Sequence, residues 1–112
     1  MDEENYNFAN MDKEHAIELV ERYIRSASEK YVISQAVLFG SFAKGTNHAD
    51  SDIDVALVMV GVADIFDAQV ELMKLRRPID LHIEPHPFRI EDFDASEPMF
   101  KEILRDGIVI NL

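Results

Sequence analysis

The stretch that decides the fold runs from Gly40 to Asp54 and reads GSFAKGTNHADSDID. It follows a short apolar run, QAVLF at 35–39, and leads into DIDVALVMV at 52–60, which is rich in β-branched residues. Both runs predict buried strands. Between them, Gly40 and Ser41 are expected to open a one-turn helix. The first backbone N–H groups of such a helix have no partner within it and therefore favour an anion such as phosphate.

Three residue types in this turn suit phosphate. Glycine at position 40 lets a phosphate group approach the backbone closely. The hydroxyl of Ser41 can add a hydrogen bond, and Lys44 can add a positive charge, although a solvated surface position is an equal alternative for the lysine. Gly45 is expected to end the short helix. Gly40, Ser41 and Lys44 are therefore the candidate phosphate-binding residues.

Two aspartates at the start of the second strand are candidate metal ligands. Residues two apart on a strand face the same side, so the carboxylates of Asp52 and Asp54 are expected to point outward together. Two like charges this close repel unless a cation lies between them, and Mg²⁺ prefers a few carboxylates together with phosphate oxygens. The pair predicts a magnesium site beside the turn.

A third acid is expected on the next strand, IDLHIE at 79–84. An adjacent strand lies about 4.8 Å away, so Asp80 would join the aspartate pair. Three carboxylates can hold two metals roughly 3.5–4 Å apart, the arrangement used for in-line displacement at phosphorus. The same strand allows a rival site for a transition metal, because His82 and Glu84 would share a face with Asp80.

The rest of the chain alternates helices and strands. Helices are expected at 11–30, 62–75 and 98–106, and a last edge strand at 108–112. Gly107 is expected to stop the last helix. This order predicts an α/β (α+β) fold, a small mixed sheet with helices packed mainly on one face. Residues 1–10 are expected to form a flexible acidic leader before a single domain at 11–112.

Composition excludes several classes of protein. The chain has 112 residues, a formal net charge of −11 and no cysteine. Without cysteine there is no disulfide or thiolate metal site, which fits a cytoplasmic protein. The negative charge should repel nucleic acid and anionic membranes, and no apolar run reaches the roughly 18 residues of a membrane span. Neither nucleic acid nor membrane is therefore an expected partner, and His15 and His86 are expected at the surface.

The candidate residues together resemble one family. Gly40-Ser41, ten residues, Asp52-x-Asp54 and then Asp80 is similar to the pattern of the nucleotidyltransferase superfamily that includes DNA polymerase beta. The chain looks like the minimal nucleotidyltransferases, which are often encoded beside a HEPN-domain protein as its antitoxin. The resemblance implies that Gly40 and Ser41 bind the triphosphate, that Asp52 and Asp54 bind Mg²⁺ ions, and that Asp80 completes the site.

The resemblance implies an activity and a partner. The expected activity is magnesium-dependent transfer of a nucleoside monophosphate, AMP from ATP, to a protein acceptor, a HEPN toxin. The 112 residues contain no second domain to complete an acceptor pocket, so the acceptor protein or a homodimer would supply the missing wall. Two alternatives stay open: a non-catalytic antitoxin that neutralises its partner by contact, and transfer to a small molecule, as in antibiotic-modifying relatives. Catalysis is favoured, because a pure binder has no need of three mutually repelling acids.

Overall fold

The computed structural model describes residues 12–94 and 96–112, and its centre is a four-stranded mixed sheet with the strand order β3-β2-β1-β4. The strands are β1 (Val32–Phe39), β2 (Ile53–Val60), β3 (Ile83–Arg89) and β4 (Ile108–Val109). The helices are α2 (Lys13–Ala27), α3 (Ser41–Lys44), α4 (Ile65–Leu75) and α5 (Pro98–Asp106), with a 3₁₀ turn η1 (Ile90–Asp92) after β3. The expected leader, residues 1–10, lies outside the described residues.

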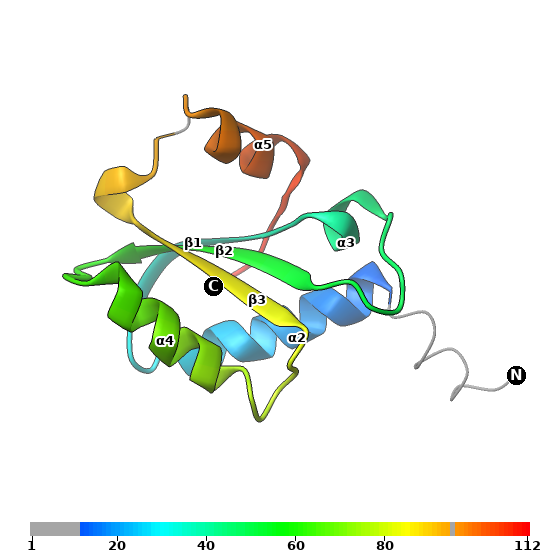
Figure 1. Cartoon of the computed structure of the whole chain (residues 1–112), viewed down its shortest axis with the longest axis horizontal. Coiled ribbons are helices and arrows are strands. Elements are labelled where there is room, and N and C mark those ends of the chain that lie inside the picture. The colour runs from blue at the N-terminus through cyan, green and yellow to red at the C-terminus, as the bar shows by residue number, and fades with distance from the viewer. Residues whose placement is uncertain (1–11, 95) are drawn as a thin grey trace, which may run out of the picture.

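Helices cover the two faces of the sheet unequally (Figure 1). α2 and α4 lie against one face, where they bury Ile53 and Val55 of β2 in the main core. α5 lies against the other face, where Phe100 packs in a smaller cluster with Val37 and Ala56. This confirms the expected mixed sheet with helices mainly on one face. It also puts the even-numbered residues of β2 on the α5 side.

A capping residue and an apolar stripe define α2. The carboxylate of Asp12 accepts a hydrogen bond from the N–H of His15 at 2.9 Å, which satisfies one of the unpaired donors at the helix start. The helix ends at Ala27 rather than at the expected Lys30. Its inner face is apolar and buried and includes Ala16, Val20, Tyr23, Ile24 and Ala27.

α4 is shorter than the helix expected at 62–75. Asp64 caps it, because its carboxylate accepts hydrogen bonds from the N–H groups of Phe66 (2.9 Å) and Asp67 (3.3 Å). A hydrogen bond between residues far apart in the sequence connects α4 to α2: the buried hydroxyl of Tyr23 donates to the carbonyl of Leu72 at 2.8 Å. The two helices therefore form one layer under the sheet.

The third strand lies further along the chain than expected, at Ile83–Arg89 instead of 79–84. Residues 79 and 80 belong to a turn, in which both N–H groups donate to the carbonyl of Arg76 at 2.9 Å. The expected strand ended before Pro85, whereas Pro85 and Pro87 both lie within the observed one. Ile53 pairs with Ile83 in parallel register, and the Ile53 N–H donates to the carbonyl of His82 at 2.7 Å. Along a parallel strand, the backbone groups of every second residue face the neighbouring strand. Because His82 faces β2, the backbone of Pro85 and Pro87 faces the free edge of the sheet, where a missing N–H breaks no ladder hydrogen bond.

The last strand is shorter than expected, because β4 covers only Ile108–Val109 of the range 108–112. It forms the edge of the sheet beside β1, as expected. Gly107 follows α5 with an ordinary φ of −82°. A Cβ at this position would collide with the Ile103 carbonyl and the Val37 side chain. The glycine is therefore needed for close packing of α5 on β1, and not for a left-handed helix end.

None of the helices in the described part of the chain has both the length and the apolar character that crossing a membrane requires.

Candidate functional site

The turn between β1 and α3 holds Gly40 directly against Asp54. The backbone of Gly40 has a φ of 78° and a ψ of −152°, a conformation that is almost restricted to glycine. A Cβ at this position would lie 2.5 Å from Oδ2 of Asp54. The glycine therefore turns the chain and also leaves room for a carboxylate. As a result, the candidate phosphate-binding turn and a candidate metal ligand lie side by side.

α3 is the one-turn helix that the sequence predicts after Gly40. The Lys44 N–H donates to the Gly40 carbonyl at 3.1 Å, and the Thr46 N–H donates to the Ser41 carbonyl at 2.9 Å. Gly45 ends the helix with a φ of 77°. The N–H groups of a first helical turn have no acceptor inside the helix, so the start of α3 offers donors to an anion.

Lys44 lies at the rim of this turn, where its Nζ is 3.5 Å from Oε1 of Glu102 on α5. The structure thus pairs this candidate with an acid in a partly exposed position. A hollow of about 180 Å³ separates the turn from α5. Its lining combines apolar and charged side chains: Phe39, Gly40, Lys44, Met99, Glu102, Ile103 and Asp106. A hydrogen bond from Arg105 lowers the pKa of Asp106, so this carboxylate is ionised at neutral pH and pairs with the guanidinium.

Asp54 has a partner that the sequence did not predict. Its Oδ1 is 3.0 Å from Nε2 of His86 on β3, and the His86 ring makes an edge contact with Phe39 at a centroid distance of 5.0 Å. His86 lies at the surface, as expected, with a side chain that is 37% exposed, but it also contacts the Asp54 carboxylate. The missing information was the parallel register, which aligns His86 with Ala56, two residues beyond Asp54 on β2.

Asp52 is exposed and directly precedes β2. The loop before it is fastened by Ser51, which is buried. The Ser51 hydroxyl accepts a hydrogen bond from the His48 N–H at 2.8 Å, and the Ser51 N–H donates to the His48 carbonyl at 3.0 Å. Ser51 therefore fixes the loop. Asp52 and Asp54, which follow it, lie together at the start of β2.

Asp80 does not lie on the third strand, contrary to expectation. In the turn before β3, its Oδ1 accepts a hydrogen bond from the His82 N–H at 2.7 Å and lies 2.8 Å from Nδ1 of the His82 ring. Short-range hydrogen bonding between Asp80 and His82 therefore competes with strand formation, which begins at Ile83.

Glu84 occupies the strand position that Asp80 was expected to fill. It is the register partner of Asp54 in the parallel pair and belongs to the same face of the sheet. Its Oε2 is 3.7 Å from Nη1 of Arg76, whose Nη1 also donates to the carbonyls of Leu81 and Ile83. The third acid next to the aspartate pair is thus a glutamate that shares a weak ion pair at the sheet edge.

A metal site of three protein ligands is not assembled within residues 12–94 and 96–112, where no three His, Asp or Glu side chains converge. The rival site of Asp80, His82 and Glu84 is not formed there, since the first two pair with each other and the third pairs with Arg76. The donors near Gly40 are carboxylate oxygens, which suit Mg²⁺. This ion usually takes one or two protein carboxylates and completes its shell with water and substrate phosphates.

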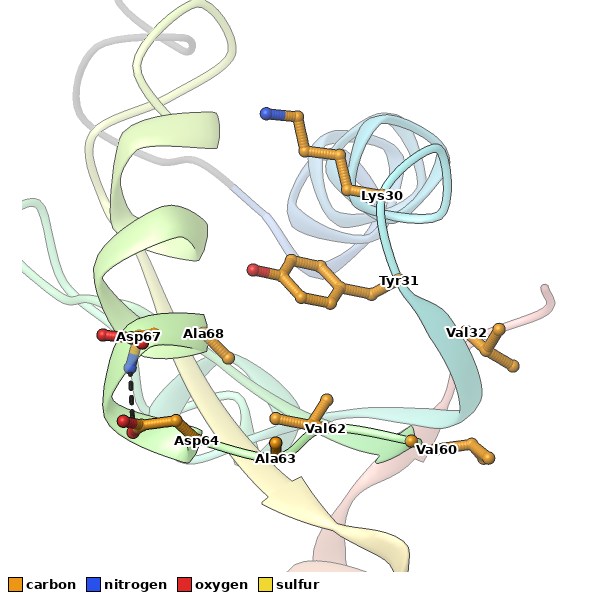
Figure 2. A pocket seen from close by; sticks show the side chains of 10 residues that line it. Lys30, Tyr31, Val32, Val60, Val62, Ala63, Asp64, Asp67 and Ala68 are labelled. Carbon is orange, nitrogen blue, oxygen red and sulfur yellow. Dashed lines mark hydrogen bonds between the residues drawn. The ribbon is translucent and has the colours of Figure 1, made fainter.

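A wider hollow of about 650 Å³ lies at the opposite end of β1 and β2 (Figure 2). Its lining includes Lys30, Tyr31 and Asp64, and the Tyr31 ring points toward α4. None of the candidate site residues lines it. β2 has eight residues, so its two ends are roughly 23 Å apart at about 3.3 Å per residue. The wider hollow is therefore separate from the site at Gly40 and Asp54.

Comparisons with known proteins agree with the fold and the motif. Residues 21–111 match the model of the family described as polymerase beta, nucleotidyltransferase, and this match covers most of the chain. The chain therefore belongs to the polymerase beta nucleotidyltransferase family. It is a nucleotidyltransferase domain, and the family uses a nucleoside triphosphate and a divalent metal.

A solved structure shows the same fold. A Sulfolobus solfataricus protein described as a nucleotidyltransferase superimposes with a TM-score of 0.62 at 17% sequence identity, covering 87% of this chain and 80% of that one. At this identity the likeness concerns the fold, and it confirms the α/β class. A search of the curated proteins finds no match.

Proposed function

We propose that this chain is a magnesium-dependent nucleotidyltransferase that transfers AMP from ATP to a protein, a HEPN-domain partner whose toxicity it silences. The observation that carries the proposal is the close approach of Gly40 and Asp54. A triphosphate bound to the backbone N–H groups of the turn at Gly40 and Ser41 would present oxygens to a cation on that carboxylate.

The reaction exchanges one bond at phosphorus for another. The acceptor hydroxyl oxygen forms a bond to the α-phosphorus of ATP, and the bond from that phosphorus to the bridging oxygen breaks. Pyrophosphate leaves, and the hydroxyl proton passes to a carboxylate or to water. Bound Mg²⁺ supplies positive charge that lowers the pKa of the hydroxyl and stabilises the leaving group. The protein binds and orients the two substrates.

Three acids form the metal-binding part of this proposal. Asp52 and Asp54 hold Mg²⁺, and Glu84 supplies the third carboxylate in place of Asp80. The register partnership of Asp54 and Glu84 supports this assignment. Replacing the carboxylate at position 84 (Glu84→Gln) should therefore abolish transfer, whereas Asp80→Asn should retain most of it. The opposite ranking would return the role to Asp80.

A protein acceptor fits the surroundings of the site. Asp52 is exposed, and the neighbouring hollow of about 180 Å³ is small. A macromolecule that covers the site could bring its own wall and exclude water from the reacting groups. The net charge of −11 also favours association with a basic protein.

A transfer assay tests the activity and the acceptor together. The protein is incubated with Mg²⁺ and each of the four nucleoside triphosphates, with and without a HEPN-domain protein encoded by a neighbouring gene, and intact masses are measured. We expect one or more added AMP groups on the partner, and none with Asp54→Asn. Asp67→Asn, an exposed acid on α4, is the matched control and should transfer normally.

The non-catalytic antitoxin gives the opposite results. The ion pair between Glu84 and Arg76 favours this second candidate, because it engages the third acid away from the aspartate pair. In that case no mass is added to the partner, and Asp54→Asn still neutralises its toxicity. Neutralisation that disappears with Asp54→Asn, together with an added mass in the wild type, rules out the contact-only account.

A further inference from the structure

We infer that His86 is a positioning residue for Asp54: it donates a hydrogen bond from Nε2 to Oδ1 and thereby fixes the direction in which the carboxylate presents its remaining lone pairs. The inference deepens the proposed function and rests on it, because the carboxylate must face a cation. The observation that carries it is the distance of 3.0 Å between the two atoms.

The sheet register brings the two side chains together. In the parallel pair, Asp54 aligns with Glu84, and Ala56 aligns with His86. Residues two apart share a face, so His86 and Asp54 lie diagonally across the same side. Ala56 is fully buried and has no side chain beyond Cβ. The imidazole can therefore lean across Ala56 to reach the carboxylate.

The His86 ring is itself restrained. Phe39, the antiparallel partner of Asp54 on β1, contacts it edge-on with an interplanar angle of 62°. In the sequence, His86 lies between Pro85 and Pro87. Each proline fixes its own φ, and the second also confines His86 to extended backbone. A side chain on so rigid a segment can hold its partner in one orientation.

The chemistry of the pair fixes the donor. An ionised carboxylate only accepts hydrogen bonds, so Nε2 of His86 must carry the hydrogen. The neutral ring with its hydrogen on Nε2 is sufficient. On the other side, Oδ2 faces the turn at Gly40, which explains how the carboxylate is directed toward the place of the triphosphate. Partners of this kind, which orient a metal ligand, typically change metal affinity about 10–100-fold when they are removed.

The test measures metal binding and not only catalysis. Manganese chloride is titrated into the full chain by calorimetry, alone and with a non-hydrolysable ATP analogue. We expect His86→Ala to weaken manganese binding about 10–100-fold and His86→Gln to restore most of it, because the glutamine amide can donate from the position of Nε2. His82→Gln is the matched control on the neighbouring Asp80 pair and should bind manganese like the wild type.

A spectroscopic measurement keeps the inference testable if His86→Ala fails to fold. Nitrogen–proton correlation spectra of the metal-free wild type should show the His86 ring protonated at Nε2, and Asp54→Asn should shift that resonance.

Three results would overturn the positioning role: unchanged manganese affinity in a folded His86→Ala, a His86→Gln variant as weak as His86→Ala, or loss of the Nε2 hydrogen when manganese binds. The last result would make His86 a direct ligand. Normal manganese binding without any nucleotide transfer would instead overturn the proposed function alone.

Discussion

Replacing Gly40 by alanine tests the central geometry of the site, because the added methyl group is directed at Asp54. A Cβ at position 40 would lie 2.5 Å from the carboxylate Oδ2. Ordinary carbon–oxygen contacts are no shorter than about 3.3 Å. The carboxylate would have to retreat by roughly 0.8 Å, the difference of those two values. The turn would also have to hold alanine at a φ of 78° and a ψ of −152°.

Two effects of Gly40→Ala can be separated by size. Backbone strain in this region costs about 1–3 kcal/mol. At about 4 °C per kcal/mol for a domain of this size, the Tm should fall by roughly 4–12 °C. Moving a reacting group by about 1 Å can lower the rate about 100-fold, so nucleotide transfer should fall by this factor even where the variant is fully folded.

Gly45→Ala is the matched control, because Gly45 also has a positive φ, 77°, but a Cβ there meets nothing within 4 Å. It should lose stability by about 1–2 kcal/mol and keep both transfer and the rise in Tm that Mg²⁺–ATP produces by binding the native state. Thermal melts with and without Mg²⁺–ATP, together with transfer rates, measure both effects. A Gly40→Ala variant that keeps the full ligand-induced rise in Tm would refute this account of the turn.

Three further predictions concern stability. Tyr23→Phe should lower the free energy of unfolding by about 1–3 kcal/mol in urea titrations, because a buried carbonyl of α4 loses its donor. Gly107→Ala should lower the same quantity by about 1–3 kcal/mol, because its methyl group must push α5 away from Val37. The hydrogen bond from Lys30 lowers the pKa of Glu71 below its ordinary 4.5. The stabilisation is therefore present above about pH 4.5 and is lost as the pH falls through the lowered pKa, so the Tm difference between wild type and Glu71→Gln should shrink in acid.

Matched substitutions separate these effects from general loss of structure. Tyr31→Phe removes the hydroxyl of a half-buried residue that directly precedes β1 and should change stability less than Tyr23→Phe. Gly61→Ala introduces a methyl group into open space, so any loss there reflects backbone conformation alone. A Gly107→Ala variant as stable as the wild type would contradict the packing role of Gly107. A Tm difference for Glu71→Gln that persists unchanged at pH 2 would contradict the ion-pair account.

Local patterns predicted the part of the site that local geometry builds. Alternation along a strand separates Ile53, which is fully buried, from the outward aspartates on either side of it. The glycine and serine after an apolar strand correctly predicted a one-turn helix at Ser41. These features depend on the backbone of one short segment, and the segment carries all the information needed.

The rest of the site depends on how two distant strands align. IDLHIE at 79–84 has the alternation of a strand, but the Asp80–His82 hydrogen bonds form a turn there instead. Parallel register is a property of the whole sheet, so the pairing of Asp54 with Glu84 and the contact with His86 could not be read from either segment alone. One signal was available: prolines at alternate positions, 85 and 87, are typical of an edge strand.

The free edge of β3 limits how this protein can associate. Pro85 and Pro87 offer no N–H to an incoming strand, the Ile83 carbonyl accepts a hydrogen bond from Arg76 at 2.9 Å, and the Pro85 carbonyl accepts one from Gln69 at 3.1 Å. Exposed edges otherwise act as templates for intermolecular β-pairing. Neither a second copy nor a partner can extend the sheet along this side, so recognition next to the site has to proceed through side chains. The same closure protects the edge nearest the proposed metal-binding acids from fibrillar assembly.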